Sequence, residues 1–365
     1  MDASGSSPYR VLIAGCGNAG RMHGQAIASY ARCELVAGAD LSGDALARFG
    51  EQFPGTKTGN DLAGLLQETK PHLVVIASAT ASHRAIFEEV MIHAPGVQGI
   101  MIEKPMATNL EDGRRMVDAC AERDICLVVN HQRRRDPNYT TMRRLIDEGA
   151  IGKIKLIRAT TAGDFMSDGT HLVDTVRYLL HDQPFAWIVG QIYRDPVGSP
   201  LGFDNLTFTG ERFGHPVESG AMAIAQFENG VQVEFRTGKL MLPHSSYHDI
   251  VITGDQGELH ACEGHLPVDL ERRAPEGPWV SEALDPWPEP DLKRFHLGQA
   301  QNFKLMLEII ENGGEHPMSG LQGLRDLELV MGLYESARLH RRLAPPIDQP
   351  RFPLEIMLEE GTFPS

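Results

Sequence analysis

Short runs of β-branched and other apolar residues alternate with amphipathic stretches between residues 10 and 130. The apolar runs are 10–14, 33–39, 72–78, 97–103 and 125–130. Stretches with helical spacing of apolar positions lie between them, at 43–50, 61–68, 83–94 and 110–123. Strands that alternate with helices of crossover length are typical of a parallel sheet with right-handed connections. This part of the chain therefore predicts a doubly wound α/β fold.

The pattern changes after residue 130, where strand signals dominate. Apolar spacing predicts a helix near 137–148, a strand at 154–162 and a helix near 170–181. Residues 247–261 have the alternation of further strands. We therefore expect a second region built mainly around a sheet.

The strongest hairpin signal in the chain is Asn229-Gly230. It separates two runs of alternating polarity, 221–227 and 231–238. Asn-Gly favours a tight hairpin because both residues tolerate positive φ angles. The two runs are therefore expected to pair in an antiparallel sheet.

The C-terminal part begins with an aperiodic stretch rich in Pro and Trp, at 264–292, which predicts a long surface loop or arm. Helical periodicity returns at 296–312 and 320–340. A chain of 365 residues is too long for one ordinary core, so two domains are expected.

Charge and hydropathy narrow the class of partner. The chain has 49 acidic and 34 basic residues and a net charge of −15, which argues against nucleic acid. The one basic run, Arg133, Arg134 and Arg135, is more typical of a solvated turn or an anion contact. Without an apolar stretch of signal-peptide or membrane-helix length, neither secretion nor a membrane partner is expected.

The cysteines indicate a reducing compartment. They are five in number and widely spaced, without CxxC pairs or histidines at zinc-finger spacing. We therefore expect a cytoplasmic protein and predict no metal site.

A glycine-rich run directly follows the first predicted strand. Its residues are Gly15, Cys16, Gly17, Asn18, Ala19 and Gly20. A GxGxxG run that opens a helix is the fingerprint of dinucleotide binding: the glycines form the turn, admit the pyrophosphate and let helix and strand pack closely. The alternative is a glycine-rich turn that binds nothing.

Asp40 ends the second predicted strand, about 20 residues beyond the glycine run, as the fingerprint requires. Its carboxylate would accept hydrogen bonds from the adenosine ribose and repel a 2′-phosphate. NAD is therefore the expected cofactor, and NADP is disfavoured.

Two further segments offer groups for proton transfer. Lys104, in Glu103-Lys104-Pro105, ends a strand where open α/β sheets bind ligands. Partial desolvation beside a cationic ring would lower the pKa of its amine and suit it to polarise a carbonyl oxygen. Taken alone, it could equally be an exposed lysine after a strand.

His171 begins a predicted helix, three residues after Asp168. An imidazole can move a proton near neutral pH. The alternative is structural, with Asp168 or Thr170 capping the helix and His171 in its first turn.

With these motifs the chain resembles the Gfo/Idh/MocA family, that of glucose-fructose oxidoreductase and inositol dehydrogenase, over nearly its full length. The resemblance rests on the glycine run, Thr80 and His83, Glu103-Lys104-Pro105, residues 130–137 (NHQRRRDP), the helix-start histidine in GTHLVD and the Asn-Gly hairpin.

The resemblance implies a fold, an assembly and a set of site residues. The fold would be an N-terminal Rossmann domain, 1–134, and a C-terminal α/β domain, 135–365, for substrate binding. An open, mainly antiparallel sheet in the second domain commonly forms the subunit interface, which implies a homodimer or homotetramer. Lys104 and His171 would be the catalytic pair. The remaining expected cofactor contacts are Ser78, Thr80, His83, Glu103, Gln132 and Arg133.

The chain departs from the family pattern at two places. The usual aspartate four residues before the histidine is Ser167 here, with Asp168 one position later. Asp168 is retained as a candidate catalytic residue, while Asp174 could hold the imidazole or pack against Arg177. Ala81-Ser82 also replace the usual Pro-Asn.

Three functions remain open at this point. The first is NAD-dependent oxidation or reduction at a secondary hydroxyl of a sugar, glycoside or cyclitol, for which Arg133, Asp168, His244 and His248 offer polar groups. The second is a glycosidase or lyase that oxidises its sugar transiently and restores the cofactor. The third is a non-catalytic NAD sensor.

Overall fold

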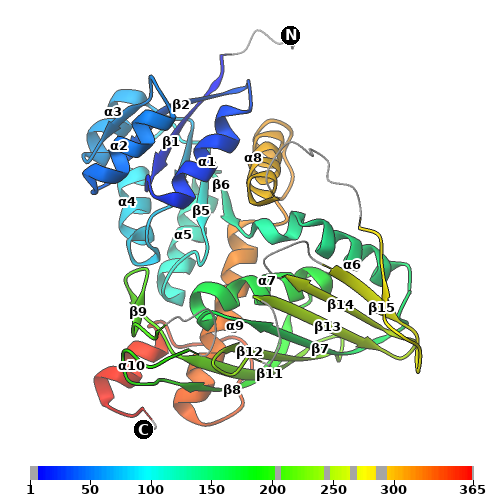
Figure 1. Cartoon of the computed structure of the whole chain (residues 1–365). Coiled ribbons are helices and arrows are strands. Elements are labelled where there is room, and N and C mark those ends of the chain that lie inside the picture. The colour runs from blue at the N-terminus through cyan, green and yellow to red at the C-terminus, as the bar shows by residue number, and fades with distance from the viewer. Residues whose placement is uncertain (1–6, 202–206, 242–246, 264–268, 285–293, 364–365) are drawn as a thin grey trace. The chain divides into compact units, whose positions relative to one another are not determined.

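The computed structural model describes residues 7–201, 207–241, 247–263, 269–284 and 294–363. His244 and parts of the 264–292 segment lie outside these ranges. The chain forms two compact units (Figure 1). The first comprises residues 1–107, 112–132 and 289–323, and the second comprises 108–111, 133–288 and 324–365. The sequence-based domain boundary at 134 stays a prediction; the described residues 294–323 belong to the same unit as the N-terminal residues.

The first unit contains a six-stranded sheet in the order β3-β2-β1-β4-β5-β6, in which every neighbouring pair is parallel. Its strands are β1 (Tyr9–Ala14), β2 (Cys33–Ala39), β3 (Lys57–Gly59), β4 (Leu73–Ile76), β5 (Gly99–Glu103) and β6 (Cys126–Asn130). This is the predicted doubly wound Rossmann order, with the reversal between β1 and β4.

Helices connect these strands and cover the sheet. They are α1 (Asn18–Ala28), α2 (Gly43–Gln52), α3 (Leu62–Thr69), α4 (His83–His93) and α5 (Leu110–Glu122), with α8 (Arg294–Asn312) packed against α1. Side chains cap several of them: Ser42 accepts from the third residue of α2, and Asp61 from that of α3. Arg10 caps the other end of α3 by donating to the Thr69 carbonyl at 3.0 Å.

The second unit contains an eight-stranded sheet in the order β16-β15-β14-β13-β7-β12-β11-β8. Only β7 and β12 are parallel, so the sheet is mainly antiparallel, as predicted. Its strands are β7 (Ile154–Thr161), β8 (Phe185–Tyr193), β11 (Gly220–Phe227), β12 (Gln232–Gly238), β13 (His248–Gly254), β14 (Glu258–Glu263), β15 (Asp269–Arg273) and β16 (Val280–Ser281). The predicted hairpin joins β11 to β12 through Asn229-Gly230, where Gly230 has φ +84°.

One correction concerns the Pro/Trp-rich segment. Residues 269–273 and 280–281 form β15 and β16 and extend the sheet, whereas a loop was predicted there. Leu270 pairs with Ala261, and Glu271 pairs with His260. Backbone pairing with β14 therefore makes this segment a strand although its sequence has little periodicity. The rest of the predicted loop lies partly outside the described residues.

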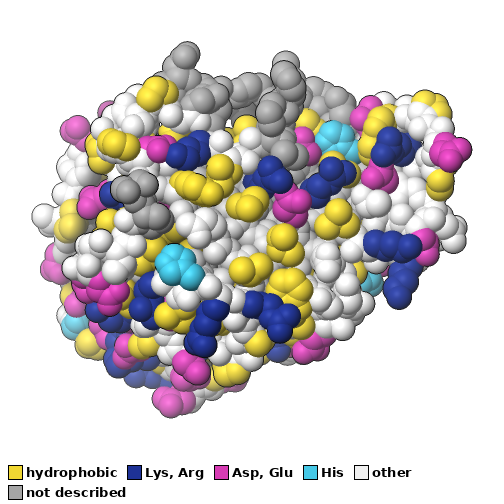
Figure 2. Space-filling view, turned by 90° about the horizontal axis from the view of Figure 1, so that it is seen from below, with side chains coloured by type: hydrophobic (Ala, Val, Ile, Leu, Met, Phe, Trp, Pro, Cys, Tyr) yellow, Lys and Arg dark blue, Asp and Glu magenta, His cyan; other side chains and the backbone are white. Residues whose placement is uncertain are grey.

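The large sheet has one covered and one open face. Ile157, Phe235 and Ile250 point to the covered face and are fully buried. The helices of this unit are α6 (Pro137–Asp147), α7 (Thr170–Leu179), most of α9 (Gly320–Leu339) and α10 (Pro353–Glu360). The open face exposes large apolar side chains from β8 and β11, namely Val189, Tyr193, Met222 and Ile224. Figure 2 shows hydrophobic side chains gathered among Lys and Arg.

Among the described residues, no helix is both long and apolar enough to cross a membrane.

We expect Gly20→Ala to destabilise the first unit by about 1–3 kcal/mol, the usual cost of overpacking. A Cβ at position 20 would lie 1.8 Å from the Gly15 carbonyl oxygen, and neither backbone can move away easily. Urea denaturation followed by circular dichroism would measure the change. Gly43→Ala is the control, because a Cβ there meets nothing within 4 Å and Gly43 lies at the start of a helix. Equal stability of the two variants would contradict this account of the turn.

Candidate functional site

Two glycines of the turn have no room for a side chain, whereas a third faces open space. Gly15 has φ +102°, and a Cβ there would lie 2.5 Å from the backbone of Ala77 and Ser78. Gly17 precedes α1, and a Cβ there would meet nothing within 4 Å. Gly15 and Gly20 are thus needed by the fold, while Gly17 leaves room beside the N-terminus of α1, where a pyrophosphate is expected to bind. Asn18 and Ala19 form the first turn of α1.

Asp40 is fixed next to this turn. Its Oδ2 accepts a hydrogen bond from the Cys16 amide at 2.7 Å, and its Oδ1 accepts one from the Ser42 amide at 2.8 Å. Both bonds hold a partly exposed carboxylate at the end of β2. The remaining lone pairs suit ribose hydroxyls, and the negative charge disfavours a phosphate there. The turn and Asp40 therefore fit NAD.

The turn after β4 contains Ser78, Thr80 and His83. His83 is fully buried, and its ring nitrogens lie 3.2 Å from the Ser78 carbonyl oxygen and 3.3 Å from that of Met106. Burial lowers the pKa of His83, so the ring is neutral near pH 7. His83 and the buried Thr80 are thus placed to hold the turn in shape, while Ser78 is only partly buried.

Glu103 lies at the centre of the polar cluster at the end of β5. Its Oε1 is 2.7 Å from His23 Nε2 of α1 and accepts from Asn130 Nδ2 of β6 at 2.8 Å. Asn302 of α8 in turn donates to the Asn130 side-chain oxygen at 3.1 Å. Burial alone would raise the pKa of Glu103, but His23 and the neighbouring Lys104 charge lower it to about 2. An ionised carboxylate is therefore anchored directly beside Lys104, whose peptide bond to Pro105 is cis.

Gln132 is the last residue of the 112–132 segment of the first unit and begins a short turn, Gln132–Arg135. Arg133, Asp168 and His171 belong to the second unit. The predicted site residues are thus divided between the two units.

A turn of π-helix precedes α7 and contains both Ser167 and Asp168. Residues 165–169 form this turn, in which the Gly169 amide reaches the Asp164 carbonyl at 3.0 Å. A π turn contains one residue more than an α turn. Ser167 Oγ lies 3.5 Å from His215, whereas Asp168 points over Gly163.

Asp168 is buried and makes two strong contacts. Its Oδ1 accepts from the Tyr247 hydroxyl at 2.6 Å, and its other oxygen accepts from Arg212, which also pairs with Asp164 at 3.2 Å. Burial and the Asp168 charge raise the pKa of Tyr247, which therefore stays protonated as a donor. These contacts suit Asp168 to orient Tyr247.

Tyr247 connects Asp168 to a group of aromatic and basic side chains. The Arg133 guanidinium lies 5.7 Å from the centre of the Tyr247 ring, and the His248 ring packs edge-on 5.0 Å from it. His248 in turn packs edge-on against His171 at 6.0 Å. The arrangement brings three sequence-predicted residues, Arg133, Asp168 and His171, to one polar cluster.

Asp174 belongs to a different network. Its Oδ1 accepts from Arg134 Nε at 2.7 Å, and Arg134 also donates to both carboxylate oxygens of Asp182. Arg177, against which Asp174 was predicted to pack, pairs with the buried Asp326. These ion pairs tie one face of α7 to Arg134 and to Asp326.

The π turn is held from behind by Glu218 and Tyr334. Glu218 accepts from the Phe165 amide and from the Tyr334 hydroxyl, each at 2.6 Å. The Tyr334 oxygen accepts from the Met166 amide at 3.1 Å, and Asp164 accepts from the Ser167 amide at 2.6 Å. Side chains thus satisfy three successive amides at the start of the turn.

Tyr247, Arg212 and Glu218 were not among the site residues predicted from the sequence. Arg212 lies in a two-residue strand, and Glu218 lies in a loop before β11, so neither position has a periodic signal. Tyr247 precedes His248 at the head of a predicted strand, and that Tyr-His pair is the one local clue.

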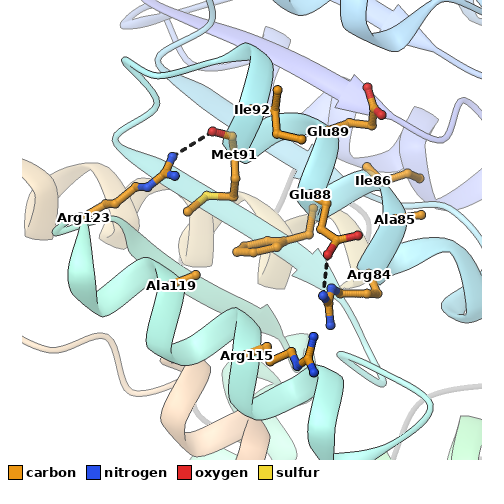
Figure 3. A pocket seen from close by; sticks show the side chains of 11 residues that line it. Arg84, Ala85, Ile86, Glu88, Glu89, Met91, Ile92, Arg115, Ala119 and Arg123 are labelled. Atoms are coloured by element: carbon orange, nitrogen blue, oxygen red, sulfur yellow. Dashed lines mark hydrogen bonds and ion pairs between the residues drawn. The ribbon is translucent and has the colours of Figure 1, made fainter.

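A surface groove between α4 and α5 contains none of these residues (Figure 3). It has a volume of about 690 Å³. Its arginines are engaged locally: Arg84 pairs with Glu88 and Asp112, and Arg123 donates to the Met91 carbonyl. The groove therefore gives no competing candidate for the site.

We expect Glu218→Gln to make stability less dependent on pH. Burial, and then the nearby Asp164, raise the pKa of Glu218 from 4.5 to about 7. A raised carboxyl pKa gives stability that is complete below about pH 4.5 and is lost as pH rises towards 7. We therefore expect the free energy of unfolding of the variant, minus that of the natural protein, to rise by up to roughly 3 kcal/mol between about pH 5 and about pH 8. A constant difference across that range would contradict the raised pKa.

Comparison with known proteins agrees with this geometry. Residues 9–131 match the model of the oxidoreductase family with an NAD-binding Rossmann fold, and residues 139–260 match the GFO/IDH/MocA C-terminal domain. Myo-inositol 2-dehydrogenase of Thermotoga maritima is 23% identical over 279 residues, which are 68% of this chain and 79% of that protein. D-apiose dehydrogenase of Paraburkholderia graminis is 25% identical over 344 residues, covering 90% of this chain and 88% of the relative.

The fold is also similar to that of an oxidoreductase from Agrobacterium radiobacter, solved in complex with NAD+, L-tartaric acid and magnesium. The TM-score is 0.75 at 21% sequence identity, over 93% of this chain and 98% of the other. Together with the two family models, these similarities confirm the family and the NAD-binding domain expected from the sequence. The chain belongs to the Gfo/Idh/MocA family of NAD-binding oxidoreductases.

Proposed function

We propose that this oxidoreductase transfers a hydride between NAD and a secondary hydroxyl or ketone of a sugar, glycoside or cyclitol. The observation that carries the proposal is the Glu103-Lys104 turn. It ends a strand of the NAD-binding sheet, and His23 and Asn130 anchor its ionised carboxylate. A lysine held at that edge is suited to act on the oxygen of a substrate.

Lys104 and His171 act on the proton of the reacting hydroxyl. NAD, when bound, accepts or returns the hydride at its nicotinamide ring. Lys104 would hold the oxygen by hydrogen bonding, and His171 would take up or return the proton. Tyr247, whose hydroxyl donates to Asp168, would accept a hydrogen bond from a substrate hydroxyl and so keep the substrate oriented.

The polar character of the second cluster supports this substrate class. Arg133 and His248 offer hydrogen-bond donors, and the Tyr247 hydroxyl oxygen offers an acceptor, which suits a molecule with several hydroxyls. The relatives named as inositol and apiose dehydrogenases point to the same class.

The open face of the large sheet supports an assembly of identical chains. Val189, Tyr193, Met222 and Ile224 expose between 36% and 42% of their surface there. A cluster of half-exposed apolar side chains on one sheet face favours association. A homodimer or homotetramer through this face is therefore part of the proposal.

We expect Lys104→Ala and His171→Ala each to lower turnover by about 10²–10⁴-fold, the usual contribution of a positioned proton-transfer group. Formation of reduced nicotinamide with a panel of inositols, free sugars and glycosides would be measured together with analysis of the sugar products. Lys57→Ala, at an exposed lysine of β3, is the control. Full activity in either variant would refute the assigned roles, and glycosidic cleavage without net reduction would favour the glycosidase or lyase reaction.

Gly17→Ala should weaken NAD binding at least about tenfold without loss of stability, because the backbone can no longer approach the pyrophosphate as closely. The new methyl group meets no protein atom within 4 Å. Calorimetric titration with NAD and a thermal melt would separate the two effects. Unchanged NAD affinity would show that the pyrophosphate does not bind against Gly17.

A further inference from the structure

Three metal-ligating side chains meet on the open face of the large sheet. Asp249 of β13 lies directly opposite Cys262 of β14, and Val251 lies opposite His260. Residues two apart on a strand share a face, so His260 and Cys262 lie on the same side as Asp249. One ligand atom from each of the three residues lies within 4.8 Å of the other two.

The His260 imidazole is held between two carboxylates. Its Nε2 lies 3.0 Å from Asp249 Oδ1, and its Nδ1 lies 3.8 Å from Glu271 Oε2 of β15. Histidines that bind metals commonly donate their second ring N–H to a carboxylate, which orients the ring. Glu271 lies at ion-pair distance, and a small shift of its side chain would let it accept that N–H when Nε2 faces the metal.

We propose that Asp249, His260 and Cys262 bind a divalent transition-metal ion of the zinc class. One sulfur, one nitrogen and one oxygen ligand suit Zn²⁺ or Co²⁺, whereas Mg²⁺ and Ca²⁺ prefer oxygen alone. Three protein ligands leave a fourth tetrahedral position for water or another donor. The sheet supplies these ligands from two paired strands, a spacing that a search for CxxC motifs does not detect.

Among the described residues, Cys262 is the only cysteine that lies in a cluster of three possible metal ligands. Burial raises the pKa of Cys16, Cys33 and Cys120 to about 12, and that of Cys126 to about 11. Those four thiols resist the deprotonation that metal binding requires. A thiolate–metal signal from the whole chain would therefore report on Cys262.

The metal site is separate from the proposed catalytic cluster. Alternation along β13 turns His248 to the covered face, where it packs against His171, and turns Asp249 to the open face. The inference therefore goes beyond the proposed function and does not depend on it.

The first test is titration of the metal-free, full-length protein with Co²⁺, followed by absorption spectroscopy. The site predicts saturation at one Co²⁺ per chain, with visible bands of tetrahedral cobalt and a thiolate-to-cobalt charge-transfer band. Cys262→Ser should abolish the charge-transfer band, and Cys126→Ser should keep it. Absence of stoichiometric binding, or the same band in Cys262→Ser, would overturn the proposal.

Two further readouts keep the test independent of misfolding in one variant. Glu271→Gln should weaken Co²⁺ and Zn²⁺ binding by about 10–100-fold while keeping the charge-transfer band, as expected for a residue that orients a ligand. The Trp279 ring lies 5.8 Å from the His260 ring, so Zn²⁺ should change tryptophan fluorescence in the natural protein but not in Trp279→Phe. If Glu271→Gln bound Co²⁺ and Zn²⁺ as tightly as the natural protein, Glu271 would not orient His260. If Zn²⁺ changed the fluorescence of Trp279→Phe as much as that of the natural protein, the metal would bind elsewhere.

Discussion

The ionised Glu103 carboxylate is the contact on which the first unit's site depends. It joins His23 of α1 and Asn130 of β6 to the end of β5, and Asn302 of α8 extends the same network. A buried carboxylate is costly unless donors surround it, and here the donors come from elements far apart in the chain. Four elements are therefore fixed around the turn that carries Lys104.

The second unit is also held by carboxylates that accept hydrogen bonds. Asp164 and Glu218 accept backbone amides of the π turn, and Asp168 accepts from Tyr247 and Arg212. The carboxylates thus satisfy amides that a helix start leaves without partners, and they orient the side chains before α7. Because Glu218 has a pKa of about 7, this unit combines a precise turn with a dependence on pH that the first unit's Glu103 does not share.

Much of the fold could be predicted because its signals are local. The central parallel strands of the first unit, β4 and β5, are short apolar runs that are almost fully buried, and the Asn229-Gly230 hairpin is fixed by its two turn residues. The three-residue strand β3 and the strands β15 and β16 were not predicted. They form by pairing with a neighbouring strand, and their own sequences have no periodic pattern.

The site was predictable only where a motif marks it. The glycine run and Asp40 follow a fixed spacing, so their placement beside one another could be expected. Tyr247, Arg212 and Glu218 are brought to Asp168 and the π turn by the tertiary fold, and no spacing in the sequence encodes that meeting. The same holds for Asp249 and Cys262, which are neighbours only through the register of β13 with β14.

The most direct test of the central claim is to follow deuterium from the carbinol carbon of a labelled polyol substrate into the cofactor. Mass spectrometry of NADH after turnover would make that measurement. The proposed hydride transfer predicts deuterated NADH in equal amount to the ketone product. Substrate conversion without deuterium in the cofactor would contradict it.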